Sequence, residues 1–309
     1  MKTRIPTLGL RRCALFAVTA MMCTLAQAKD LEPRSYSNTP VGLNFLIAGY
    51  GYAEGKLALD PSTPITDAKY RQGTSVVALA HSLDAWGNSA KVDMVLPYSS
   101  FDGHALVGGR SREREMTGLN DPRFRFSMNF HGAPALSLKE FAGYQQDVIV
   151  GASLQVTAPL GQYDHSRLVN LGNNRWSFKS ELGVSKAWGP WTVELVPSVT
   201  FYTDNTDFNR GRTLAQDPLY MLQTHVIYGF ASGIWLAVDG AWFTGERTTL
   251  DGVKGDNRQT NTRAGITVAL PVDRHNSVKL YLSTGTSTRT GSTYDLVGVA
   301  WQYRWGGGY

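Results

Sequence analysis

Alternation of apolar and polar residues, repeated along the chain, is the feature that most limits its fold. In DPRFRFSMNF, residues 121–130, every second position from Phe124 to Phe130 is large and apolar, whereas the positions between them include Arg123 and Arg125. Successive side chains of a β-strand point to opposite faces. The segment is therefore predicted to be a strand with one apolar face and one charged face.

About twelve segments follow this pattern, and most have about the 10–13 residues that a tilted strand needs to cross a bilayer. The pattern predicts an all-β fold, a transmembrane antiparallel β-barrel of about 12 strands. The segments lie near residues 41–52, 73–84, 89–98, 121–131, 147–158, 176–187, 191–203, 219–230, 234–244, 260–270, 276–285 and 293–305.

The connections support a barrel with short periplasmic turns and longer extracellular loops. Four short connections read DAWGNS, WGP, ASG and PVDRHN. A longer periplasmic connection, 132–146, contains Ser137 and Glu140, which predict a capping box and a short helix. The expected extracellular loops lie at 53–72, 99–120, 159–175, 204–218, 245–259 and 286–292.

Aromatic and proline positions refine this topology. Aromatic rings favour the boundary between hydrocarbon and water, so tryptophans at strand ends are expected at the lipid interface. The last strand ends at Trp305, where we expect the barrel-assembly machinery to engage. Pro97 and Pro197 cannot donate a ladder hydrogen bond, so Pro97 predicts a strand end or bulge and Pro197 a local bulge. The expected interface tryptophans are Trp188, Trp191, Trp235 and Trp305.

The first 28 residues are predicted to be a cleaved signal peptide, with the barrel at 29–309. A basic stretch, MKTRIPTLGLRR, precedes an apolar run and the small residues AQA. Cys13 and Cys23 both lie in this peptide, and its removal lowers the 30 basic residues to 26, against 25 acidic ones. The mature chain is therefore nearly neutral, and nucleic-acid binding is not expected. Export together with a barrel predicts the outer membrane of a Gram-negative bacterium.

Several long stretches resemble one known family: LEPRSYSNTPVGLNFLIAGYGYAEG, GLNDPRFRFSMNFHGAPAL, GASLQVTAPLGQYD, RLVNLGNNRWSFKSELGVSKAWGPWTVEL and VGVAWQYRW. The chain is similar to the meta-pathway phenol-degradation family of outer-membrane β-barrel proteins, whose members are often labelled transporters. The resemblance covers essentially the whole mature chain. It implies a channel or transporter, linked to the degradation of phenol and other aromatic compounds, that passes small aromatic or hydrophobic molecules.

In such a barrel the charged face of each strand points into the lumen, because an arginine on the lipid side at mid-membrane costs about 2–4 kcal/mol. Basic candidates outnumber acidic ones, which predicts a mild preference for anions such as aromatic carboxylates or phenolates. The same charges could instead pair with one another and fill the interior. The lumen candidates are Lys91, Asp93, Arg123, Arg125, Lys179, Glu181, Glu194, Asp239, Arg263, Lys279 and Arg304.

Three other interpretations stay open from the sequence. A soluble β-sandwich explains alternation equally well, although it accounts poorly for the strand lengths and the loop asymmetry. A structural barrel with a plugged lumen would have the same pattern as a channel. A phospholipase-type hydrolase needs serine, histidine and a third group together, and no such motif is present. We therefore expect no enzyme, no metal site and no cofactor.

Outer-membrane lipid and lipopolysaccharide are expected partners, besides a small-molecule permeant. The charged stretch GGRSREREM, residues 108–116, could contact lipopolysaccharide phosphates or form a hydrated loop.

Overall fold

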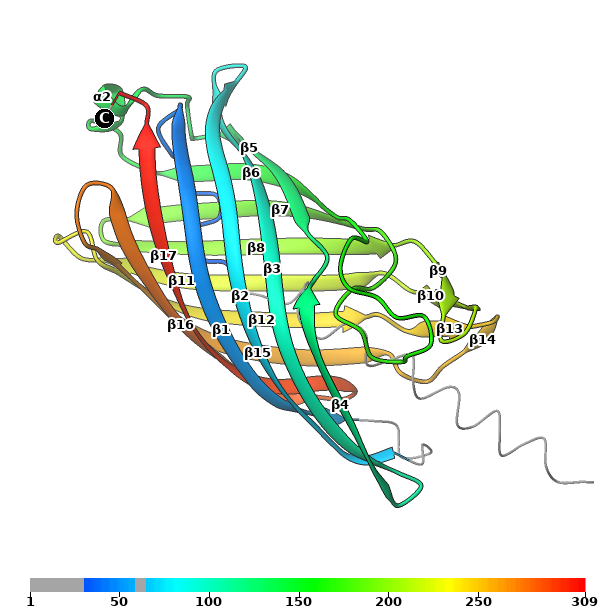
Figure 1. Ribbon diagram of the computed structural model, residues 1–309. Coiled ribbons are helices and arrows are strands. Elements are labelled where there is room, and N and C mark those ends of the chain that lie inside the picture. The colour runs from blue at the N-terminus through cyan, green and yellow to red at the C-terminus, as the bar shows by residue number, and fades with distance from the viewer. Residues whose placement is uncertain (1–30, 59–64, 309) are drawn as a thin grey trace, which may run out of the picture.

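The computed structural model describes residues 31–58 and 65–308, and it is a closed antiparallel β-barrel (Figure 1). The predicted signal peptide, 1–28, lies outside the described residues. Strand β2 pairs with both β1 and β3, which closes the sheet on itself. The wall consists of β1 (Leu43–Ala58), β2 (Ile65–Ala85), β3 (Asn88–Val107), β5 (Arg123–His131), β6 (Val148–Thr157), β7 (Ser177–Trp188), β8 (Trp191–Tyr202), β11 (Leu219–Gly229), β12 (Trp235–Gly245), β15 (Gln259–Pro271), β16 (Asn276–Thr288) and β17 (Gly291–Gly306).

This arrangement confirms the predicted barrel and excludes the sandwich, because one sheet closes on itself and, among residues 31–58 and 65–308, its apolar side chains stay exposed instead of packing against a second sheet. The orientation of the faces is clear from neighbouring residues. Phe126 and Leu282 are 42% and 54% exposed, whereas Ser127 and Ser283, the next residues along, are 7% and 8% exposed. Apolar side chains therefore point outward, where a membrane can cover them, and polar ones point inward. Among the described helices, none has the length and apolarity to cross a bilayer.

The wall is irregular where β3 changes its partner. The inner part of β3 pairs with β5, and its outer part pairs with β4 (Arg110–Leu119). Pro97 lies between these two ladders, after the pair Val95–Arg123 and before the pair Tyr98–Leu119. On the side of β3 that faces β4 and β5, Pro97 therefore falls in the gap between two ladders, where its missing N–H leaves no ladder hydrogen bond unmade.

The other strand proline occupies a similar gap. Pro197 pairs with Leu222 of β11, but the β7–β8 ladder stops at Glu181–Ser198 and resumes at Val184–Leu195. Both strands advance by three residues across this gap, so there is no extra residue. The predicted bulge at Pro197 is wrong, because an interrupted ladder accommodates the missing donor without a register shift.

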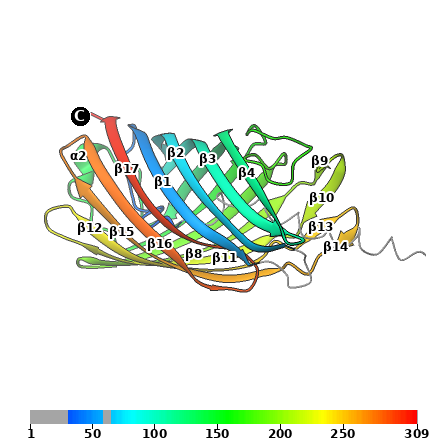
Figure 2. The same cartoon turned by 60° about the horizontal axis from the view of Figure 1, so that its bottom comes forward.

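Two small elements lie at opposite ends of the barrel (Figure 2). At one end, with the C-terminus, is α2 (Leu138–Phe141), and its N-cap Ser137 forms the predicted capping box with Glu140. At the other end, four short strands form a separate sheet, which we call the outer sheet. They are β9 (Asn205–Phe208), β10 (Arg212–Gln216), β13 (Thr248–Leu250) and β14 (Val253–Lys254).

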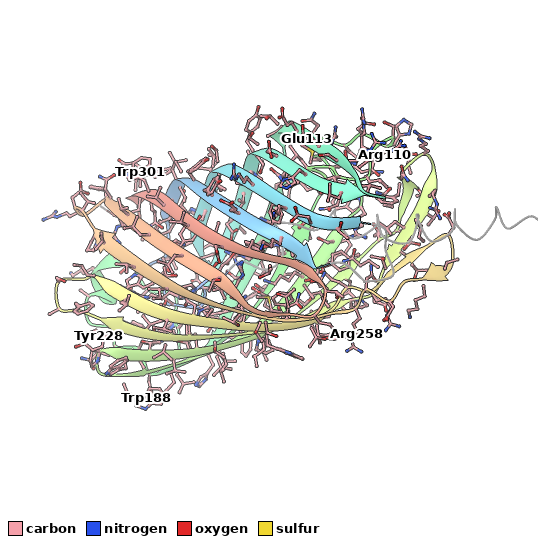
Figure 3. The ribbon with its side chains drawn as sticks, turned by 90° about the horizontal axis from the view of Figure 1, so that it is seen from below. Arg110, Glu113, Trp188, Tyr228, Arg258 and Trp301 are labelled. Atoms are coloured by element: carbon pink, nitrogen blue, oxygen red, sulfur yellow. The ribbon has the colours of Figure 1, made fainter. Side chains whose placement is uncertain are left out.

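The outer sheet corrects the expected loops at 204–218 and 245–259, which contain these strands. The loops expected at 53–72 and 99–120 likewise contain strand, because β1, β2 and β3 extend far beyond the predicted segments and β4 follows them. Figure 3 shows the contrast between the two ends of the barrel. Trp188, Tyr228 and Trp301 project at the barrel end that carries α2, and Arg110, Glu113 and Arg258 project at the opposite end.

Candidate functional site

An N-terminal segment, residues 31–42, runs through the lumen before β1 begins. Wall side chains bind the backbone of its first half, and its last residue, Gly42, donates its backbone N–H to the carbonyl oxygen of Ser82 in β2. Lys91 Nζ donates to the carbonyl oxygen of Ser35 at 2.8 Å. The backbone N–H of Arg34 donates to Glu194 Oε2 at 2.8 Å, and that of Glu32 to Gln223 Oε1 at 3.2 Å. These contacts attach the segment to β3, β8 and β11.

A charge cluster around Arg125 of β5 strengthens this attachment. Arg125 Nη1 donates to Glu32 Oε2 of the segment at 2.6 Å, and its Nε donates to Asp93 Oδ2 of β3 at 2.9 Å. A guanidinium group between two carboxylates is well suited to a partly buried site, because its planar donors serve both partners. Lys179 and Glu181 form a second buried pair, with Nζ and Oε2 2.5 Å apart.

Tyr36 is the apolar anchor of the segment. It is 2% exposed and packs with Ile149 and Val196. Its ring lies over Gly183 and Gly151, so closely that a Cβ built on Gly183 would stand 2.1 Å from Tyr36 Cδ2. Glycine at these wall positions therefore makes the space that the ring occupies.

Three ionisable residues form a row in the wall beneath the segment. Glu194, His225 and Asp239 are direct neighbours on β8, β11 and β12, and all three are almost fully buried. His225 Nδ1 and Asp239 Oδ1 lie 2.6 Å apart, within hydrogen-bond distance, and Thr267 Oγ1 donates to Asp239 Oδ2 at 2.8 Å. Among the described residues, no group of three or more histidines, cysteines and acids forms a metal site.

The segment fills one side of the lumen and leaves a cavity of about 430 Å³ on the other. Five adjacent strands, β16, β17, β1, β2 and β3, form the far side of this cavity, and we call this surface the open wall. Many of its inward positions are small or aliphatic, and the others carry hydroxyl or amide groups, two tyrosines and Lys279. The small and aliphatic positions include Ile47, Gly49, Gly51, Val76, Ala78, Val95, Leu296 and Ala300.

An apolar cluster, which we call the mouth cluster, lies in the lumen at the outer end of the open wall. Tyr70, Phe101 and Tyr294 of the wall pack with Val169 and Leu171. The two aliphatic residues belong to the lumen loop, residues 158–176, which connects β6 to β7 and folds inward. The rings of Tyr70 and Phe101 are stacked, with centroids 5.9 Å apart. Tyr294 and Leu296 also line the cavity, so the cluster forms its outer end.

Asp121 fastens the lumen loop to the wall. It lies in the joint between β4 and β5 and is fully buried. Its Oδ1 accepts from the backbone N–H of Gly161 at 2.9 Å, and its Oδ2 accepts from that of Asn173 at 2.7 Å. Both ends of the loop are therefore tied to one carboxylate at the irregular point of the wall.

The register places all eleven predicted lumen residues at inward-facing positions of their strands, but in several groups rather than one ring. Lys91, Asp93, Arg123 and Arg125 lie on β3 and β5 beside the segment, and Glu194 and Asp239 lie beneath it. Arg263 is at the mouth, with its guanidinium 3.6 Å from the ring centroid of Tyr294. Arg304 bonds the periplasmic turn through the carbonyl oxygen of Arg274, and Lys279 is on the open wall.

The four predicted interface tryptophans do not all point the same way. Trp188, Trp191 and Trp305 are 55%, 49% and 38% exposed on the outside of the barrel. Trp235 shares the inward positions of Ala237, and the guanidinium of Arg34 lies 5.5 Å from its ring. The expected lipid contact of Trp235 is corrected to a lumen contact with the segment, because strand parity decides the face.

Sequence reasoning missed the residues of the segment, together with His225 and Asp121. The segment has no period-2 pattern, so nothing marked it as an occupant of the lumen. His225 carried a usable signal, because it alternates with Gln223 and Ile227 on the inward face of β11. Asp121 had none, because its partners are 40 and 52 residues away.

Solved structures with this fold are outer-membrane barrels. An outer membrane channel from Pseudomonas putida F1 is 20% identical, with a TM-score of 0.76 over 89% of this chain and 100% of the channel. The transport unit of the autotransporter AIDA-I from Escherichia coli is 10% identical, with a TM-score of 0.53 over 94% of this chain and 97% of that one. Identities this low establish the fold alone.

Sequence comparison identifies the family. No curated protein sequence matches the chain. A family model does match, and it covers residues 60–303, most of the barrel. The chain belongs to the outer-membrane barrel family described as "Putative MetA-pathway of phenol degradation".

Proposed function

We propose that the chain is a passive outer-membrane channel for small aromatic or hydrophobic molecules that feed the degradation of phenol-like compounds. The cavity on the open wall carries this proposal. Its volume, about 430 Å³, falls in the range of small-molecule sites, and its lining combines aliphatic surface with a few polar groups. Such a lining suits a ring better than a hydrated sugar, because a sugar's hydroxyls would lose water without gaining enough partners.

The family supports the same proposal. Its description refers to phenol degradation, and the Pseudomonas putida F1 barrel with the same fold is a channel. The mild anion preference expected from the sequence remains part of the proposal. In the lumen, however, four of the eleven predicted charged residues pair with one another: Arg125 binds Asp93, besides Glu32 of the segment, and Lys179 binds Glu181.

Flux through the purified barrel in proteoliposomes tests this function. Benzyl alcohol and a monosaccharide are compared, and liposomes without protein supply the background for the membrane-permeable aromatic probe. The proposal predicts protein-dependent flux of the aromatic solute well above that of the sugar. Equal flux of both solutes, or none of either, would contradict it.

A plugged structural barrel is the second candidate, and the N-terminal segment favours it. The segment is bound through several hydrogen bonds, one ion pair and a buried tyrosine, which would occlude part of the lumen permanently. The flux measurement separates the two candidates, because a permanent plug gives background values for the aromatic solute.

We do not propose an enzyme. His225 and Asp239 resemble two members of a hydrolytic triad, but the nearby hydroxyl of Thr267 donates to Asp239 rather than to the imidazole. Recognition of Trp305 by the barrel-assembly machinery and binding of lipopolysaccharide stay predictions.

A further inference from the structure

Lys279 is the lysine of the open wall, and the described residues give it no ion pair. It lies on β16 and lines the cavity, and its Nζ is 5.9 Å from the ring centroid of Tyr281. Within the described part of the chain, no carboxylate lies within ion-pair distance of Lys279. The two acids that also line the cavity are occupied, because Glu32 binds Arg125 and Asp239 binds His225 and Thr267.

Small residues keep the space beside Lys279 open. Across the open wall, Lys279 pairs with Ala300, Ala300 with Gly49, and Gly49 with Val76. At the positions paired with Lys279 on the next two strands, therefore, no side chain is larger than a methyl group. The cavity extends over these positions rather than being filled by them.

Tyr281 adds a phenolic hydroxyl group on the same face of β16 as Lys279. It lies two residues after Lys279 on the same face of β16, and it pairs with Gly298, which pairs in turn with Gly51. A Cβ built on Gly298 would stand 2.2 Å from the ring, and one built on Gly51 would stand 3.3 Å from the hydroxyl oxygen. The hydroxyl end of the ring thus lies over Gly298 and reaches toward Gly51, and both Tyr281 and Gly51 line the cavity.

The open wall also has an aliphatic part. Ile47, Val76 and Val95 line the cavity on β1, β2 and β3, away from Lys279. The cavity therefore has a cationic, hydroxyl-bearing side on β16, and its aliphatic side begins at Ile47, two strands and so about 10 Å away across the sheet, since neighbouring strands are about 4.8 Å apart. The extended lysine side chain and the length of a small aromatic acid together span this distance.

We propose that Lys279 and Tyr281 form a binding site for the carboxylate of a small aromatic acid, whose ring rests on the aliphatic part of the open wall. This assignment deepens the proposed function and rests on it. A carboxyl group has a pKa of about 4, whereas a phenol has a pKa of about 10. At neutral pH the carboxylate is therefore the anion that an ammonium group distinguishes from a neutral ring. The lysine then sets specificity for aromatic acids within a path that also admits neutral aromatics.

Binding of benzoate and of benzyl alcohol to the full-length barrel in nanodiscs at pH 7 tests the site. Both probes have one ring, but only benzoate is charged. Lys279→Met is expected to weaken benzoate binding by about tenfold to a hundredfold, the value of a lost hydrogen bond to a charged group, and to leave benzyl alcohol unchanged. Tyr281→Phe is expected to weaken benzoate by a smaller factor.

Two further variants keep the result interpretable. Lys279→Arg retains the charge and is expected to retain most benzoate binding. Lys139→Met, on the exposed helix α2, is the matched control and is expected to bind both probes like the unaltered protein. The thermal transition of each variant reports whether the barrel is folded.

The site is refuted if Lys279→Met, once folded, binds benzoate as tightly as the unaltered barrel, or loses both probes equally. If Lys279→Met does not fold, Tyr281→Phe and Lys279→Arg decide, because unchanged benzoate binding in the first and full loss in the second would both contradict the assignment. Flux of both probes, measured in the same variants, distinguishes failure of the binding site from failure of the proposed channel function. Flux of benzyl alcohol without benzoate selectivity would refute the site alone, and no flux of either probe would refute the channel.

Discussion

Gly183→Ala tests the claim that the N-terminal segment is held by a ring resting on bare backbone. The new Cβ would stand 2.1 to 2.6 Å from three ring atoms of Tyr36, including Cγ, which is close to its own backbone. The ring cannot relieve this contact by moving its tip, so the tyrosine must leave its site. Full burial of a large side chain stabilises by about 1.5–3 kcal/mol. The undocked population of the segment should therefore rise by about tenfold to 150-fold.

A buried wall cysteine measures that population. Ser127 is 7% exposed and lies between Lys91, its partner on β3, and Asn129, both of which bind the segment. In Ser127→Cys, labelling by a water-soluble maleimide requires undocking, so its rate follows the open population. We expect Gly183→Ala and Tyr36→Ala each to accelerate labelling.

The double variant decides between this cause and general damage to the wall. If the alanine acts only by colliding with the ring, Gly183→Ala adds nothing once Tyr36 is already alanine. Equal labelling of Tyr36→Ala and the double variant is the expected result. The reasoning would be refuted if the double variant accelerated labelling by the product of the two single-variant factors. It would also be refuted if Gly183→Ala alone left the labelling rate unchanged.

Three further predictions concern the wall and the loop. Arg125→Met should destabilise the barrel by about 3–5 kcal/mol in urea unfolding, because it leaves the carboxylates of Glu32 and Asp93 without their shared cation, and a loss below about 1 kcal/mol would contradict the network. Phe126→Arg should cost about 2–4 kcal/mol in the same assay if this side meets hydrocarbon, and no loss would reverse the orientation of the faces. Asp121→Asn should speed hydrogen exchange of the lumen loop with little change in the strands, whereas unchanged exchange would show that the carboxylate does not hold the loop.

The strands and their faces could be predicted because a two-residue period is a local property of the chain. The alternation alone predicts opposite faces for Phe126 and Ser127, and their exposure and register agree. The capping box of Ser137 and Glu140 is equally local, since its two residues are three apart. Such signals need no knowledge of the rest of the fold.

The contents of the lumen could not be predicted, because they depend on contacts between distant residues. Tyr36 lies in a polar stretch, and its burial depends on two glycines of β6 and β7 and on Ile149 and Val196, which are all more than 100 residues away. Trp235 was assigned from its place near a strand end, but the parity of β12 and the position of Arg34 turn it inward. The outer sheet was missed because strands of two to five residues carry too few alternations to be recognised.

The central claim is that aromatic molecules use the cavity on the open wall, and a pair of adjacent substitutions tests it most directly. Val76 lines the cavity, whereas Val77, the next residue of β2, is 49% exposed on the outside of the barrel. Flux of benzyl alcohol into proteoliposomes is compared for Val76→Trp and Val77→Trp, after equal amounts of folded protein are confirmed. The account predicts that the tryptophan facing the cavity blocks most of the protein-dependent flux and that the outward one leaves it unchanged. Equal flux through both variants would contradict it.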